Sequence, residues 1–246
     1  MKEEVELYRT AMIENLAGFD DTLMEKYFED PESISENDLI AAIRCATIGH
    51  RINPVLCGAS FRNKGVQRLI DAIVRYLPSP MDMPAVKGIN PKTEKMETRY
   101  SDKAEPFAAL AFKIASDPYV GRLTFIKVYS GTLNSGESVY NVTSGKKERV
   151  SKILQMHSNK QIQLDSISAG SIVALVGMKD IHTGDSLTDD KHPIILENID
   201  FPEPVITISI EPKTKDDEAK LMAALTKLSE EDPTFIEKVD EESNQT

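Results

Sequence analysis

The sequence predicts a multidomain α+β protein in which three kinds of segment follow one another. Residues 1–80 show the helical spacing of apolar side chains, whereas residues 106–200 contain short β-rich runs. Glycines separate these runs at intervals mostly near ten residues, which is typical of a small antiparallel barrel or sandwich. Residues 201–246 contain a strand, a helix and a second strand. A length of 246 residues favours more than one unit, since a domain averages roughly 150 residues.

The first segment is expected to be mostly helical, with three short helices over residues 3–48. The third helix begins at Ser35-Glu36-Asn37-Asp38, a near capping box with Asp in place of Glu, and Gly49 is expected to end it in the left-handed conformation. Residues 54–56 predict an apolar strand, and a turn of small residues follows it. Apolar residues at 66, 69, 70, 73, 74 and 77 then predict an amphipathic helix that the prolines at 78 and 80 terminate.

The two boundaries between segments are rich in proline. Residues 78–106 contain five prolines, many charges and little periodicity, so residues 81–105 are expected to be a linker or an extended surface loop. Prolines at 202 and 204 mark the second boundary. Beyond it we expect a strand at 205–210, a helix at 214–229 and a strand at 235–239. One helix on two strands buries little apolar surface, so this last unit is expected to be truncated.

Composition and charge limit the classes of function. The net charge of −11 disfavours non-specific binding of nucleic acid, which needs many Lys and Arg contacts, so any RNA contact is expected to be local. No apolar run approaches the roughly 20 residues of a membrane span, and no secretory signal opens the chain, which indicates a cytoplasmic protein with no membrane partner. Cys45 and Cys57 have no ligand partners at metal-binding spacing and are expected to be buried free thiols, with no metal site.

A search for catalytic motifs finds none. A phosphate-binding loop reads G-x-x-x-x-G-K-[ST], and the nearest segment, Gly145-Lys146-Lys147, has Tyr140 at the first glycine position and no hydroxyl residue at the last. Asn63-Lys64-Gly65-Val66 lacks the Asp of a guanine-reading N-K-x-D motif. The four histidines are scattered, so surface or packing roles are favoured over catalysis. We therefore expect no catalytic residue in this chain.

One basic cluster stands out in the acidic sequence. It consists of Lys146, Lys147, Arg149 and Lys152, where a turn at residues 143–145 leads into a strand. Alternation would place Lys147 and Arg149 on one face, where they could contact phosphate groups. The same pattern would also protect an edge strand from pairing with another chain. The sequence leaves both interpretations open.

Several long segments, taken in order, resemble bacterial translation elongation factor G, the ribosomal translocase of the translational GTPase family. They are NPVLCGASFRNKGVQRLIDAIVRYLPSP, DPYVGRLTFIKVYSGTLNSGESV, GKKERVSKILQMH, AGSIVALVGMKDIHTGDSL and PEPVITISIEPKTKDDEAKLMAALTKLSEEDPTF. The resemblance covers essentially the whole chain and implies an internal fragment.

The resemblance assigns each segment to a domain. Residues 1–80 would be the C-terminal part of the GTPase domain with part of its inserted helical subdomain, and 81–105 the linker. Residues 106–200 would be the antiparallel, Greek-key-like β-barrel of the second domain. Residues 201–246 would begin a third, ferredoxin-like domain. The missing phosphate-binding loop agrees with this division.

The resemblance also implies a function and site residues. The parent protein couples GTP hydrolysis, with Mg²⁺, to movement of tRNA and mRNA on the ribosome, whereas this chain alone would be non-catalytic and bind no cofactor. Gly58-Ala59-Ser60-Phe61 lies at the fifth guanine-nucleotide motif, which usually reads Gly-Ser-Ala, and a backbone N–H there would contact the guanine carbonyl once the missing part of the GTPase domain is present. The barrel would contact ribosomal RNA and small-subunit proteins, with Arg122 joining Lys146, Lys147, Arg149 and Lys152 as RNA contacts.

Two alternatives accompany this interpretation. The first is a related ribosome-bound GTPase, such as a ribosomal-protection or release-type factor. The second is a stand-alone β-barrel binding module with no enzymatic parent. The upstream gene sequence and the fourth and fifth domains would discriminate the related factor, whereas G-x-x-x-x-G-K-[ST] in the upstream reading frame would eliminate the stand-alone module.

Overall fold

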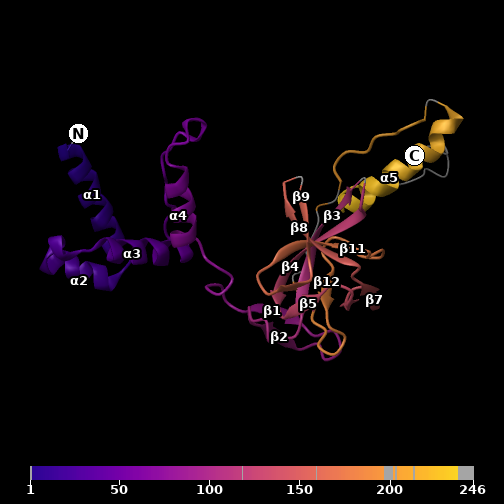
Figure 1. Ribbon diagram of the computed structural model, residues 1–246, viewed down its shortest axis with the longest axis horizontal. Coiled ribbons are helices and arrows are strands. Elements are labelled where there is room, and N and C mark those ends of the chain that lie inside the picture. The colour runs from indigo at the N-terminus through magenta and orange to yellow at the C-terminus, as the bar shows by residue number, and fades with distance from the viewer. Residues whose placement is uncertain are drawn as a thin grey trace. The chain divides into compact units, whose positions relative to one another are not determined.

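The computed structural model describes residues 2–117, 119–158, 160–196, 202, 204–212 and 214–237. The chain divides into two compact units, Met1–Met83 and Pro84–Thr246, which we call the N-terminal unit and the C-terminal unit. Each has its own hydrophobic core. Figure 1 shows that helices form the first unit and strands most of the second. In the part of the chain that is described, no helix is both long and apolar enough to cross a bilayer.

The regular structure described in the N-terminal unit is helical, as expected. Its elements are α1 (Lys2–Ala17), α2 (Asp21–Glu29), the 3₁₀ turn η1 (Pro31–Ser33), α3 (Glu36–Ile48), the 3₁₀ turn η2 (Ser60–Arg62) and α4 (Val66–Tyr76). Helices α1, α2 and α3 pack together around buried apolar side chains. These are Ile13, Leu16, Leu23, Ile34, Leu39 and Ala42.

Both ends of α3 are capped. The predicted capping box is confirmed, because the Asp38 N–H donates to Ser35 Oγ at 3.2 Å and the Ser35 N–H donates to the Asp38 carboxylate at 2.9 Å. The expectation for Gly49 is wrong. Gly49 has φ −74° as the C-cap, and His50 takes the left-handed conformation with φ 55°. The helix ends at Ile48 as expected, but the bonds that close it run from the His50 N–H to the Thr47 carbonyl oxygen, at 3.1 Å, and from the Arg51 N–H to that of Ala46, at 2.9 Å, so the left-handed residue is His50.

The segment after α3 departs from the prediction at its strand. Helix α4 forms as expected, with Gly65 at its N-cap, but residues 54–56 lie in no strand of the described structure. A strand forms only beside a hydrogen-bonded neighbour, and no described strand lies next to these residues. Val55 is accordingly exposed, as are apolar side chains along α4 such as Ile70 and Val74. Cys45 and Cys57 are exposed too, so the expectation of buried thiols is wrong.

The residues just after α4 belong to the N-terminal unit. One Arg44 Nη atom donates to the carbonyl oxygens of Arg75 and Leu77, at 2.9 and 3.1 Å. The other lies 2.6 Å from the Asp82 carboxylate. Asp82 also accepts hydrogen bonds from the Ser79 N–H and hydroxyl, and with Arg44 these lower its pKa to about 2. Arg44 thus fixes both the C-terminal end of α4 and the turn that follows it.

The C-terminal unit is built on one large antiparallel sheet. Its strands, in spatial order, are β7 (Lys146–Arg149), β6 (Ser138–Asn141), β12 (Ser186–Thr188), β3 (Ala108–Asp117), β4 (Gly121–Ser130), β11 (Ile172–Val176), β8 (Lys152–His157) and β9 (Lys160–Leu164). A separate pair joins β5 (Thr132–Asn134) to β10 (Ser166–Ser168). Alternating residues of the large sheet build the core, including the fully buried Ile126, Ile153 and Leu175. The predicted antiparallel β architecture is therefore confirmed.

The expected linker contains a β-hairpin, which corrects that prediction. Strand β1 (Val86–Ile89) pairs with β2 (Met96–Arg99), and Ile89 exchanges backbone hydrogen bonds of 2.9 and 2.8 Å with Ile195. A Cβ atom on Gly88 would lie 2.4 Å from the Ile195 carbonyl oxygen, so only glycine allows this close approach. The prolines did not prevent pairing because Pro84 precedes β1 and Pro91 lies in the turn.

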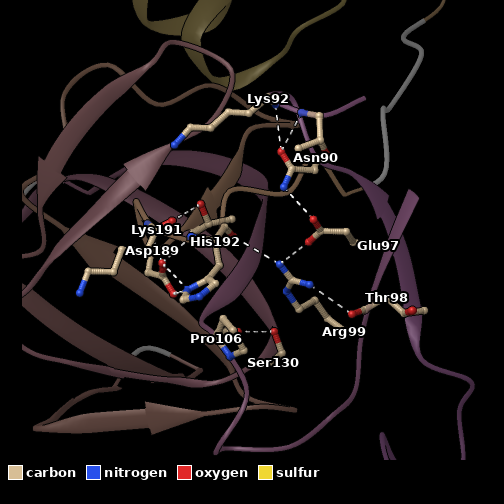
Figure 2. A network of polar contacts seen from close by, with 12 residues as sticks. Asn90, Lys92, Glu97, Thr98, Arg99, Pro106, Ser130, Asp189, Lys191 and His192 are labelled. Atoms are coloured by element: carbon tan, nitrogen blue, oxygen red, sulfur yellow. Dashed lines mark hydrogen bonds and ion pairs between the residues drawn. The ribbon is translucent and has the colours of Figure 1, made fainter. Parts of the chain in front are cut away.

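A polar network anchors the hairpin on the rest of the C-terminal unit (Figure 2). Arg99 is buried, and its Nη2 atom lies 2.9 Å from the Glu97 carboxylate and donates to the His192 carbonyl oxygen at 3.4 Å. Glu97 also accepts a 2.7 Å hydrogen bond from the Asn90 amide. This bond, and then the contact with Arg99, lower the pKa of Glu97. The hairpin is therefore held by the packing of Val86 on the cluster that includes Ile194, by the Ile89–Ile195 backbone bonds and by the Arg99–His192 hydrogen bond, whereas the Glu97–Arg99 ion pair lies within the hairpin.

The last segment forms the predicted helix, and the described part of it contains no strand. The helix, α5, spans Lys215–Glu231. Residues 205–210 lie in no strand, nor do residues 235–237, while residues 238 and 239 lie outside the described residues. The alternating apolar pattern of 205–210 remains exposed, at Val205 and Ile206 above all. A strand pattern needs a partner strand, and no described strand supplies one.

Candidate nucleotide loop and nucleic-acid interface

The four residues of the expected guanine loop lie in a tight loop before α4. The Ala59 N–H donates to the Lys64 carbonyl oxygen at 3.0 Å, and the Lys64 N–H donates to the Ala59 carbonyl oxygen at 3.1 Å. A Cβ on Gly58 would lie 3.1 Å from the Lys64 carbonyl oxygen, so glycine here lets the two sides of the loop come close. The small residues of this segment therefore allow the backbone on the two sides of the loop, at residues 58–59 and 64, to come close together.

The tip of this loop presents unused backbone donors. Ser60 and Phe61 open the turn η2, and their N–H groups donate to no acceptor in the part of the chain that is described. The Phe61 side chain is fully exposed. The first N–H groups of a helical turn are free by geometry and suit a carbonyl or anionic acceptor. The Ala59 N–H, in contrast, is already bonded.

Three of the four residues of the basic cluster, Lys146, Lys147 and Arg149, lie on an edge strand of the large sheet, and Lys152 begins β8. Strand β7 is a terminal strand of the ladder and pairs only with β6 among the described strands. Lys146 Nζ lies 2.8 Å from the Asp180 carboxylate, and Lys147 Nζ lies 2.5 Å from that of Asp190. Each contact lowers the pKa of its Asp, and the bond to Asp180 raises the pKa of Lys146. These are exposed pairs, which contribute little to stability and are open to exchange.

The remaining members of the cluster have no ion pair among the described residues. Arg149 donates from Nε to the Gly136 carbonyl oxygen at 3.3 Å, and Lys152, at the start of β8, is exposed. Between them, Val150 is completely buried and turns the chain from β7 to β8. Arg149 and Lys152 are therefore the cationic side chains of the cluster that no described acid neutralises.

Arg122 is engaged by the protein itself. Its guanidinium donates to the carbonyl oxygens of Lys179, at 2.5 Å, and Ile181, and Nη1 lies 3.5 Å from the Glu230 carboxylate. Only 19% of the side chain is exposed. Arg122 and Lys146 thus meet the same loop around residue 180, one at backbone carbonyls and the other at a carboxylate. The structure brings these two predicted residues near each other but leaves Arg122 facing inward.

The acidic partners of Lys146 and Lys147 were not predicted from the sequence. Asp180 and Asp190 follow β7 by more than 30 residues, and nothing in their local sequence marks them as partners of lysine. Glu148 completes the arrangement by accepting hydrogen bonds from the N–H groups of Lys179 and Asp180, both at 3.0 Å. Among the described residues, no group of three or more His, Cys, Asp or Glu side chains is arranged to hold a metal ion.

Known proteins are similar to the chain along its whole length. Family models match residues 106–190, as elongation factor G domain 2, and residues 201–246, as elongation factor G domain III. Elongation factor G of Amoebophilus asiaticus (strain 5a2) is 58% identical over all 246 residues, and that of Karelsulcia muelleri (strain GWSS) is 57% identical over 239 residues. The chain spans about a third of these relatives, 35% and 34% of their lengths.

A solved structure is similar in fold to this chain. A crystal structure of a Thermus thermophilus protein matches with a TM-score of 0.76 at 25% identity, over 99% of this chain and 34% of that one. The large antiparallel sheet and these matches are those of translation factors. The chain belongs to the elongation factor G family.

Proposed function

We propose that this chain is the ribosome-contacting and domain-coupling portion of a GTP-dependent translocase. In this proposal residues 1–80 complete a GTPase domain, residues 106–200 form the barrel of the second domain, and residues 201–246 begin a ferredoxin-like third domain. The identity of 57–58% to elongation factor G along essentially the whole chain carries the proposal. A ribosomal-protection or release-type factor is the alternative, and the names of these relatives favour the translocase.

GTP chemistry would belong to the parent protein, with GTP or GDP and Mg²⁺ bound mainly by residues outside this chain. The phosphate-binding motif G-x-x-x-x-G-K-[ST] occurs nowhere in the 246 residues. We therefore expect the chain alone to hydrolyse no GTP and to bind GDP negligibly, because phosphate contacts dominate nucleotide affinity. A GTPase assay with the purified chain tests this, and turnover above background would refute it.

The guanine loop would contribute one backbone hydrogen bond to the base. The N–H groups of Ser60 and Phe61 support this, because they are the loop donors that bond nothing in the described chain. A backbone donor survives exchange of the side chain, so the Ala59-Ser60 order would retain base recognition. In the full-length factor we expect Ser60→Ala to preserve discrimination of GDP from ADP, and Ser60→Pro, which removes the N–H, to reduce it. Equal discrimination by both variants would place the donor elsewhere.

The edge strand β7 and the start of β8, the next strand along the chain, would contact ribosomal RNA through Arg149, Lys152, Lys147 and Lys146. Arg149 and Lys152 lead this proposal because no described acid neutralises them, whereas Lys147 must first leave Asp190. We leave Arg122 out of the interface, since protein acceptors surround its guanidinium.

A pair of variants with opposite effects tests the RNA contact. Arg149→Glu in the full-length factor should weaken ribosome binding and reduce its dependence on salt, because each phosphate contact releases counterions. Asp190→Asn should strengthen binding, since it frees Lys147. If neither variant alters the salt dependence, the cluster only protects the edge of the sheet.

A further inference from the structure

Two glutamates occupy an unfavourable position at the C-terminal end of α5. Glu230 and Glu231 are its last two residues, and the last turn contains no basic residue. The free carbonyl groups at this end of a helix carry partial negative charge, so carboxylates here destabilise an isolated helix. A contact outside the helix is needed to offset this cost.

The end of the β3–β4 ladder supplies that contact. The Ser116 N–H, near the end of β3, donates to Glu231 Oε1 at 2.8 Å. Arg122, near the start of β4, lies 3.5 Å from Glu230 Oε2. Ser116 and Arg122 are paired in the register of the two strands, so both glutamates bind at one place on the sheet. Hydrogen bonds to charged groups are stronger than neutral ones.

Arg122 is held in position to make this contact. The carbonyl oxygens of Lys179 and Ile181 accept from its two Nη atoms, which fixes the guanidinium with one edge toward Glu230. Because these acceptors are neutral, the positive charge of Arg122 remains available to the carboxylate. The arginine therefore acts as a preset site for an acidic side chain.

The apolar part of the contact is small. Helix α5 packs against β3 (Figure 1). Among the α5 side chains that the structure describes, only Leu225 is buried, and Leu228 remains half exposed. Side chains of the Arg122–Glu230 pair are 19% and 40% exposed, which leaves the pair open to screening by salt.

We propose that Glu230 and Glu231, bound to Arg122 and the Ser116 N–H, form an electrostatic clasp that docks α5 reversibly on the β3–β4 end of the large sheet. Arg122 is the positioning residue of this clasp. Leu225 is the one buried side chain among those described on α5, and Leu221 and Met222 are partly buried, so the charged contacts contribute to how often α5 leaves the sheet. The inference is independent of the proposed RNA and nucleotide contacts.

Amide hydrogen exchange of the 246-residue chain, followed residue by residue by NMR, tests the clasp. The variant Glu230→Gln/Glu231→Gln should accelerate exchange at Leu225 and at Ser116 about tenfold at low salt. Raising the salt concentration should accelerate exchange in the unaltered chain about threefold and have no further effect on the variant. The control Glu237→Gln, which alters a glutamate beyond α5, should leave these rates unchanged.

If the clasp does not exist, the Glu230→Gln/Glu231→Gln variant should change amide exchange in the opposite direction. Without a clasp, removing two carboxylates from the negative end of α5 stabilises the helix and slows its exchange. Slower or unchanged exchange at Leu225 would overturn the proposal. Equal acceleration in the Glu237→Gln control would also overturn it, as would equal acceleration at the core amides of Ile126 and Leu175, because the clasp is local.

Discussion

Replacement of Gly88 by alanine should undock the β1–β2 hairpin from the C-terminal unit. The added Cβ would lie 2.4 Å from the Ile195 carbonyl oxygen and 2.6 Å from Ile194 Cγ1. Ordinary contact begins near about 3.5 Å, so the hairpin must retreat by about 1 Å. Such a shift stretches the two Ile89–Ile195 hydrogen bonds, now 2.9 and 2.8 Å, beyond bonding range.

The expected magnitude follows from these contacts. Two backbone hydrogen bonds contribute about 1–3 kcal/mol together. Alanine offsets roughly 0.4–1 kcal/mol of this lost stability, because it restricts the unfolded chain more than glycine does. The middle of the resulting range, about 1.3 kcal/mol, corresponds to roughly tenfold more frequent opening of the hairpin.

Amide hydrogen exchange at Ile89 and Ile195 measures this opening. Both amides should exchange about tenfold faster in Gly88→Ala, whereas Lys87→Ala, which alters the exposed neighbour on β1, should leave them unchanged. If Ile195 keeps its full protection in Gly88→Ala, the close approach of the two backbones does not determine docking.

Three other predictions concern the cores, the charged caps and the thiols. Ile153→Ala should lower the free energy of unfolding of the C-terminal unit by about 2–5 kcal/mol in urea titrations, because Ile153 is fully buried; a loss below about 1 kcal/mol would contradict this. Asp38 has its pKa lowered from 3.8 to about 2 by Lys26 and then Ser35, so its stabilisation is present above pH 3.8 and is lost as the pH falls toward 2. Asp38→Asn should flatten the pH dependence of unfolding of the N-terminal unit in that window, and an equally steep profile would contradict this. Cys45 and Cys57 should both react with a thiol reagent in the native protein, and a count of one would show that one thiol is protected.

Local signals predicted the helical parts of the fold. The capping box of α3 and the apolar period of α4 depend on residues within a few positions of one another, and both are present. Strands depend on distant partners. The apolar run at 54–56 and the apolar residues of 205–210 led to strand predictions that are wrong, because no described strand pairs with either segment. The β1–β2 hairpin was missed although its strands are close in the sequence, because each is only four residues long. The additional backbone partner of the hairpin, Ile195, lies about a hundred residues away.

In the candidate site, too, features within one strand could be predicted from the sequence, whereas contacts between distant segments could not. Sequence proximity correctly grouped Lys146, Lys147 and Arg149, because they share one strand. It did not reveal that Asp180 and Asp190 pair with the two lysines, since these contacts arise only when the sheet forms. Arg122 was grouped with them through the resemblance to elongation factor G. Its charge is directed to Glu230 and to backbone carbonyls, which no pattern in its own strand indicates.

The two attachments to the large sheet differ in strength, and this difference indicates where motion concentrates within the C-terminal unit. The hairpin is held by paired backbone bonds, a buried Arg99 and a glycine contact that leaves no free space. Helix α5 is held by one buried leucine and by contacts that solvent partly screens. Opening free energies increase with the buried apolar contacts and protected hydrogen bonds of a segment. The hairpin should therefore move with the sheet, whereas α5 should separate from it well before the sheet unfolds.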